Sequence, residues 1–145
     1  MKQQLTQLMN RNLANLQVLY VKLHNYHWNV KGKQFFAIHE ATEGYYNHVA
    51  EQYDAIAERL LQLNEKPLVT MKDYLSVATI SESTENDFTP EQVIDHLLAD
   101  FSALLKDYKE IAEAADSIGD RTTANMADEN IEWLEKVIWM LNASK

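Results

Sequence analysis

With 145 residues, 46% of them hydrophobic, no cysteine and a formal net charge of −9, the chain falls outside several classes of protein. It has the length of one domain and enough apolar residues to bury a core, which excludes a disordered chain. The absence of cysteine excludes a disulfide scaffold and a thiolate metal site. The negative charge disfavours nucleic acid as a partner, because non-specific affinity for DNA comes from Lys and Arg on phosphates.

The amino-terminal sequence MKQQLTQLMN has neither the apolar centre of a signal peptide nor the Arg-rich pattern of a transit peptide. No run approaches the ~18 apolar residues that span a bilayer. We therefore expect a cytoplasmic protein that does not enter a membrane. Only three glycines and two prolines occur, which favours an all-α fold.

The first two predicted helices each carry one apolar stripe with a spacing of three or four residues. The first extends to about Val30, with Gly32 just beyond it, and the second begins near Phe35 and runs to about Leu63. Their predicted core positions are Leu5, Leu8, Leu16, Leu19, Tyr20, Leu23, His27 and Val30, then Ile38, Tyr45, Val49, Ile56, Leu60 and Leu63.

Residues 64–88 form a long connection, broken by Pro67 and by the polar run SESTEND, with room for one short helix over 71–78. The sequence TPEQ at residues 89–92 then places Thr at an N-cap, Pro at the first helical position and Gln at the capping-box position.

The third predicted helix follows this cap and ends at Gly119, and the last helix begins at a cap formed by Asp120 or Thr122. The predicted core side of the third helix includes Ile94, Leu97, Leu98, Phe101, Leu104, Leu105, Tyr108, Ile111 and Ala115. The predicted core side of the last helix includes Met126, Ile131, Leu134, Ile138 and Leu141.

The lengths of the connections predict the topology. Short first and last turns make antiparallel neighbours, whereas about 25 residues can travel the ~40 Å length of a long helix and leave the second and third helices parallel. We therefore predict an all-α fold: a four-helix bundle with the long crossover of ferritin-type bundles and a short helix inside it, in a single domain over residues 1–145.

The second predicted helix also carries a polar stripe beside its apolar one. His39 and Glu43 are four residues apart, as are Asp54 and Glu58, and all four fall within an arc of about 100°. Imidazole and carboxylate together suit divalent metals. The rise from Glu43 to Asp54 is about 16 Å, whereas metal–ligand bonds are about 2 Å, so one ion cannot bind both pairs of one helix.

A two-fold axis would bring the two pairs together. If two copies of this helix pack antiparallel, His39 and Glu43 of one chain face Asp54 and Glu58 of the other, which gives two identical composite sites. His27 completes each site if the first helix packs beside the second. A hydrogen-bonded core histidine and a solvated row of carboxylates remain the alternative, and spacing alone leaves both interpretations open.

A di-iron centre inside one subunit is disfavoured. Bundles with such a centre use Glu-x-x-His motifs on paired helices, and no histidine here has Glu three positions before it. His24, His48 and His96 lack partners of this kind, and we predict surface or packing roles for them.

Residues 23–60, LHNYHWNVKGKQFFAIHEATEGYYNHVAEQYDAIAERL, resemble the signature of the Dps family, the DNA-binding proteins from starved cells, also called mini-ferritins. The resemblance centres on HNYHWN, on FFAIHE and on DAIAER, and the predicted helix lengths and crossover agree with the family over nearly the whole chain.

This resemblance implies a hollow homododecamer with intersubunit ferroxidase centres, which oxidise Fe(II), preferably with hydrogen peroxide, and store ferric mineral inside. Glu43 occupies an acidic position that is often Asp in relatives, and Trp28 would sit beside the centre as an electron donor. Trp139 and nearby tyrosines could also absorb oxidising equivalents, but we interpret them as core aromatics. The family's metal-ligand positions fall on His27, His39, Asp54 and Glu58.

Asp116, Asp120 and Asp128 lie where the family has an acidic three-fold channel, and converging carboxylates there would concentrate Fe(II). A solvated helix end is the alternative. Members that coat DNA usually carry a Lys/Arg-rich tail, whereas this chain has only Lys2 and Lys145 outside its terminal helices, so DNA binding is expected to be weak or absent.

Two other functions remain open at this point. One is a nucleoid-associated, DNA-protecting protein with a secondary metal site, and the other is a structural bundle whose polar stripe is only a dimer interface. A gel shift at physiological salt tests the first, and iron-dependent loss of peroxide tests the second.

Overall fold

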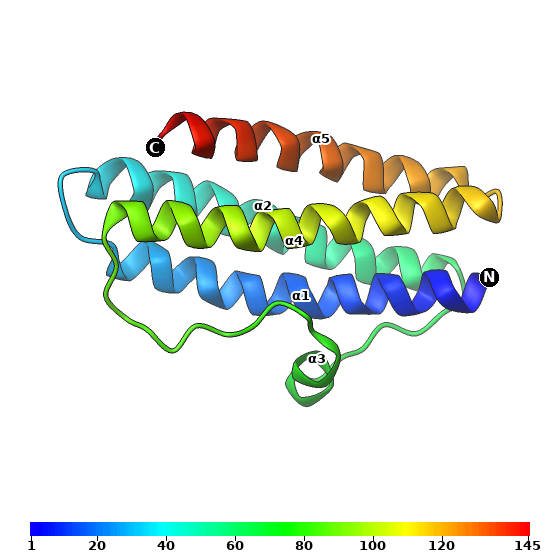
Figure 1. Ribbon diagram of the computed structural model, residues 1–145. Helices are drawn as coiled ribbons and strands as arrows, with labels where there is room; N and C mark the ends of the chain where they lie inside the picture. The colour runs from blue at the N-terminus through cyan, green and yellow to red at the C-terminus, as the bar shows by residue number, and fades with distance from the viewer.

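The computed structural model describes all 145 residues and contains five helices: α1 (Lys2–Asn29), α2 (Phe35–Gln62), α3 (Met71–Val77), α4 (Pro90–Ser117) and α5 (Arg121–Ala143). Figure 1 shows α1, α2, α4 and α5 side by side, with α1–α2 and α4–α5 as antiparallel hairpins. The connection that contains α3 returns along the outside of the bundle beside α1, so α2 and α4 run parallel (Figure 1). The predicted all-α bundle with a long crossover is confirmed.

Helix ends follow the caps that the sequence predicted. The Thr89 side chain accepts a hydrogen bond from the backbone of Gln92, and the Gln92 side chain accepts one from the backbone of Thr89, which completes a capping box at the start of α4. Gly119 has φ +76°, a left-handed conformation that suits glycine. Of the two candidates for the next cap, Asp120 is the one that accepts a bond from the first turn of α5.

Three asparagines of α1 hold the crossover in place. Between α2 and α4 most of the backbone lies outside regular structure, so its polar groups need other partners. Asn10, Asn15 and Asn25 supply them at three points along the connection. Asn10 donates to Lys66 O and accepts from Leu68 N, Asn15 accepts from Thr79 N and Ile80 N, and Asn25 donates to Glu85 O.

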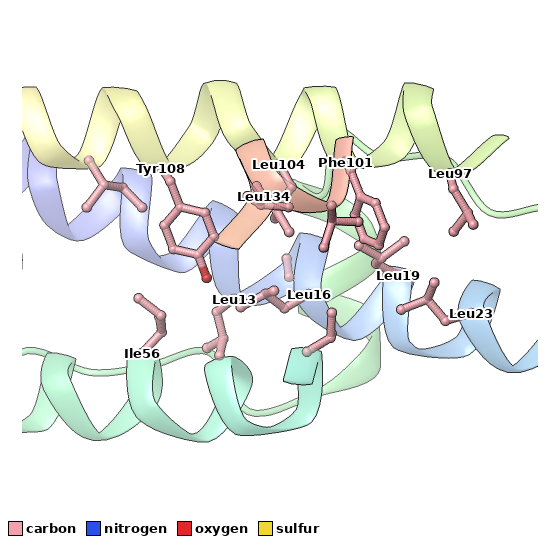
Figure 2. Close-up of a cluster of buried hydrophobic side chains, with 14 of the residues drawn as sticks. Leu13, Leu16, Leu19, Leu23, Ile56, Leu97, Phe101, Leu104, Tyr108 and Leu134 are labelled. Atoms are coloured by element: carbon pink, nitrogen blue, oxygen red, sulfur yellow. The ribbon is translucent and has the colours of Figure 1, made fainter. Parts of the chain in front are cut away.

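The hydrophobic core lies between the four long helices. In Figure 2, Leu97, Phe101, Leu104 and Tyr108 project from α4 towards leucines of α1, and Ile56 faces them from α2. The members of this cluster are 0–2% exposed: Leu13, Leu16, Leu19, Leu23, Ile56, Leu97, Phe101, Leu104, Tyr108 and Leu134. None of the helices is long and apolar enough to cross a bilayer.

The buried face of α5 differs from its prediction. Ile131 and Ile138 are only half-buried, whereas Ala127 and Val137 are buried. Small residues let α5 pack closely on α4, and a pattern based on the largest apolar side chains does not detect them. Trp139, predicted to be a core aromatic, is 66% exposed, so that prediction is wrong.

Candidate metal centre

Two predicted ligands, His27 and His39, lie face to face where α1 turns into α2. Their ring centroids are 3.6 Å apart and their planes are inclined by 15°. Nδ1 of His27 donates to the backbone carbonyl of His39 over 2.6 Å, and Nδ1 of His39 donates to the carbonyl of His27 over 2.8 Å. A ring nitrogen that faces a carbonyl must carry the proton, so Nε2 of each neutral ring keeps its lone pair.

Thr42 supports the same arrangement and was not identified from the sequence. Its hydroxyl lies 3.1 Å from Nδ1 of His27 and donates over 2.7 Å to the carbonyl of Ile38. The Thr42 oxygen can therefore accept a second, bifurcated hydrogen bond from the same Nδ1–H group of His27. Histidines that ligate metals are usually fixed in this way, through the ring nitrogen that does not bind the metal.

The electrostatics also favour a neutral imidazole at His27, whose side chain is buried. Burial lowers the pKa of His27, and the adjacent His39 ring lowers it further. The hydrogen bond to the His39 carbonyl and the charge of Glu43 act in the opposite direction without reversing the shift. A neutral ring with a free Nε2 is the form of histidine that binds metal ions.

The other predicted ligands are not gathered at this pair within one chain. Asp54 and Glu58 are exposed on α2, further along the helix towards its carboxyl end, and Glu43 is exposed beside the histidines. No group of three or more His, Cys, Asp or Glu side chains of a single chain is placed to hold a metal ion. One chain therefore provides a pair of oriented imidazoles and a separate pair of carboxylates.

Trp28 does not stack on either histidine of the pair. It is 67% exposed, and its ring lies against His24, with centroids 5.5 Å apart. Consecutive residues of a helix point about 100° apart, which explains why Trp28 does not follow His27 towards His39.

At the corner between α4 and α5 an open hollow of about 540 Å³ is lined by Glu113, Asp116 and Asp128, together with Arg121 and Asn125. Two of the three predicted channel residues are present there, and Glu113, not predicted, joins them.

Asp120 is absent from this lining, and its carboxylate has other partners within the chain. Its carboxylate caps α5 by accepting from the backbone of Thr123 and pairs with Arg59 of α2 over 3.0 Å. Burial would raise the pKa of Asp120, but hydrogen bonds from Thr123 and Arg59 outweigh it and lower that pKa.

The fold and the oriented histidine pair define a ferritin-like helical bundle, and the family model described as a ferritin-like domain matches residues 6–144. General stress protein 20U of Bacillus subtilis is 46% identical over 99% of this chain and 98% of its own. The DNA protection during starvation protein of Helicobacter pylori is 40% identical over 90% of each chain. This chain belongs to the Dps family of ferritin-like proteins.

Solved structures agree with this assignment. A Dps protein from Bacillus brevis has a TM-score of 0.93 and 39% identity, with 97% of this chain and 94% of that chain covered. A Dps protein from Vibrio cholerae O1, described as a member of a broad superfamily of ferritin-like diiron-carboxylate proteins, has a TM-score of 0.92 and 37% identity, with 97% and 88% covered.

Proposed function

We propose that this protein is a ferroxidase that detoxifies and stores iron. It oxidises Fe(II), preferably with hydrogen peroxide, and keeps the ferric mineral inside a hollow homododecamer, which protects the cell from oxidative damage. The observation that carries this proposal is the pair His27 and His39, whose Nδ1 protons are held by backbone carbonyls while no third ligand of the same chain joins them.

The missing ligands come from a second copy of the chain. Asp54 and Glu58 of the partner copy would face His27 and His39, with Glu43 as a further carboxylate. Imidazole nitrogen and carboxylate oxygen are donors that suit iron. The separation of about 16 Å along α2 supports a shared centre, because no ion reaches both pairs of one helix.

The chemistry at such a centre follows from its ligands. Carboxylates favour Fe(III) over Fe(II), so they help the iron substrate to lose an electron. Hydrogen peroxide accepts one electron from each of two Fe(II) ions, and its O–O bond breaks to give two hydroxides. No hydroxyl radical is released when both electrons arrive together.

Mixing two inactive variants tests the shared centre. His39→Ala and Asp54→Ala proteins are dissociated, combined in equal amounts and reassembled, and Fe(II) oxidation by peroxide is measured. An interface between unlike variants has one site with both defects and one site with all its native ligands. Random pairing makes about half of the interfaces mixed, so roughly a quarter of all sites should recover activity.

The controls are the wild-type protein and each variant alone, taken through the same dissociation and reassembly. A centre built within one chain predicts no recovery, because every chain then carries a defect in its own ligand set. Zero recovery in particles shown to contain both variants would therefore reject the shared centre.

Exposed apolar side chains support the large assembly. Val21 on α1 and Met71 and Leu75 on α3 line one hollow and are 53%, 50% and 48% exposed. Apolar side chains grouped in this way mark contact surfaces. We expect a native mass of twelve subunits, and a monomer or dimer at micromolar concentration would contradict the proposal.

The hollow at the α4–α5 corner is the proposed entry for Fe(II). Asp116 and Asp128 would attract the cation there. We expect the variant Asp116→Asn/Asp128→Asn to slow iron uptake at low ionic strength and to differ less from wild type as salt is added. An unchanged rate at every ionic strength would remove these residues from the entry route.

Direct DNA binding is expected to be weak or absent, because a net charge of −9 per subunit repels the phosphate backbone. A gel shift at physiological salt with assembled protein tests this expectation, and retention of DNA there would favour the nucleoid-associated alternative.

A further inference from the structure

The centre of the bundle contains polar side chains among its apolar ones. Asn12 of α1 and Tyr108 of α4 are fully buried, and Gln52 of α2 is 4% exposed. The Tyr108 hydroxyl donates a hydrogen bond to Oε1 of Gln52 over 3.0 Å. Figure 2 shows this hydroxyl pointing from α4 towards α2, within the cluster of buried apolar side chains. A polar contact therefore joins α2 and α4 deep inside the core.

Asn12 brings a second amide to this contact. Burial raises the pKa of Tyr108, and the amide of Asn12 acts on that pKa in the opposite direction, which places the amide beside the phenol oxygen. Even so, both polar atoms of Asn12, Nδ2 and Oδ1, have no hydrogen-bond partner within the chain, and neither has Nε2 of Gln52. Three free polar atoms thus lie around one buried hydroxyl, from three different helices.

The rest of the protein offers these atoms no partner. Asp107 of α4 is already engaged, because its carboxylate pairs with Arg11 over 2.8 Å and accepts from Asn15 over 2.6 Å. A second subunit cannot reach Asn12 or Gln52, since the core of their own chain encloses both. Buried amides are nearly always hydrogen-bonded. Their partner is therefore a small molecule enclosed within the bundle.

We propose that Asn12, Gln52 and Tyr108 form an internal binding site for water, with at least one molecule in each subunit. The two amide nitrogens donate, while Oδ1 of Asn12 and the phenol oxygen accept. A ligand that satisfies them must both donate and accept, as water does, and buried water typically makes about three hydrogen bonds to such groups. An ion does not fit, because the free atoms include donors and an acceptor but no charge.

This water would link α1 to the contact between α2 and α4. A bridging water is nearly as favourable in enthalpy as a direct hydrogen bond, so the three helices are held together by polar bonds at the middle of an apolar core. The site goes beyond the proposed ferroxidase function and does not depend on it, because it involves none of the predicted metal ligands. Its test therefore uses iron-free protein.

A high-resolution crystal structure of the assembled, iron-free wild type is the first test. We expect a water peak about 2.7–3.2 Å from the side chain of Asn12 and from Nε2 of Gln52. Asn15 is the internal control, because its amide makes four hydrogen bonds within the chain and should show no water. Density without a peak at Asn12, or with its amide bonded directly to Tyr108 or Gln52, would overturn the proposal.

Oxygen-17 relaxation dispersion of the same protein in solution is the second test, because it counts water molecules that stay inside the protein. The variant Asn12→Leu keeps a side chain of similar size but removes both free atoms, and it should lose about one long-lived water per subunit. Asn25→Leu is the matched control: it makes the same change on the same helix outside the core, and it should keep the wild-type count. Equal counts in Asn12→Leu and wild type would reject the site. If Asn12→Leu does not assemble, the wild-type crystal structure decides alone.

Discussion

Asn15 is expected to contribute more to stability than any other exposed or buried amide that touches the crossover. Its side chain is fully buried and makes four hydrogen bonds. Oδ1 accepts from the backbone of Thr79 over 2.8 Å and of Ile80 over 3.0 Å. Nδ2 donates to the Thr79 hydroxyl over 3.0 Å and to the carboxylate of Asp107 over 2.6 Å.

The size of the effect follows from these partners. A neutral hydrogen bond contributes about 1 kcal/mol net and one to a charged group about 1.5–3 kcal/mol, while a buried group left unpaired costs more. The Asn15→Ala variant removes all four bonds and leaves the buried Ile80 amide and one oxygen of Asp107 without this partner. We expect it to lower the free energy of unfolding by about 4 kcal/mol.

Denaturant unfolding of assembled protein at one fixed concentration measures this loss, because assembly contributes to apparent stability. Hydrogen exchange of residues 78–81 should accelerate at the same time. Asn25→Ala is the matched control, since Asn25 also lies on α1 and holds the crossover, but by a single exposed bond of 2.8 Å to Glu85 O. Its expected cost is below about 1 kcal/mol. Equal losses in the two variants would refute the reasoning.

Three further predictions concern other parts of the molecule. Thr42→Val removes a hydrogen-bond partner of His27 and should weaken Zn(II) binding at the centre about 10- to 100-fold. Titration calorimetry on assembled protein measures this affinity, and an unchanged affinity would exclude a role for the Thr42 hydroxyl. Asp120→Asn should destabilise the protein at neutral pH, because the lowered pKa of Asp120 stabilises the folded state at pH values above the unfolded pKa of about 3.9. The difference in stability from wild type should vanish as the pH falls through the folded pKa. Thermal unfolding across pH measures this difference, and a difference that is the same at every pH would contradict the prediction. Thr89→Ala should cost about 1 kcal/mol through loss of the capping box, with Thr122→Ala, a threonine that caps nothing, as the control in the same unfolding assay.

The parts of the fold that depend on local chemistry were predictable from sequence. The capping box at residues 89–92 and Gly119 are local signals, and the structure has α4 between them. The buried face of α5 was predicted less well, because Ala127 contributes to packing by being small, and hydrophobic periodicity gives weight to size.

The asparagines of α1 carried a signal that periodicity alone does not use. Asparagine is a poor helix former, and Asn15 lies within the apolar stripe. A polar residue of low helix propensity at a core position indicates a side chain that binds something inside the protein. Which backbone groups it binds depends on how the crossover folds, and the sequence of α1 does not specify that.

At the candidate centre the sequence indicated that His27 could join His39 if the first helix packs beside the second, and the structure has the two rings in contact. The partners of their Nδ1 atoms are backbone carbonyls, which every residue has, so no sequence motif marks them. Asp120 shows a different limit: it precedes Thr123 by three residues, a spacing typical of a helix cap, and within the chain its carboxylate has this local role.

The way His27 and His39 hold each other has a consequence for how such a centre tolerates change. Each imidazole is oriented by the main chain of the other residue and not by its side chain. Substitution of one histidine removes a ligand but keeps the carbonyl that orients the remaining ring. The two histidines can therefore be lost or replaced one at a time, with each defect staying local.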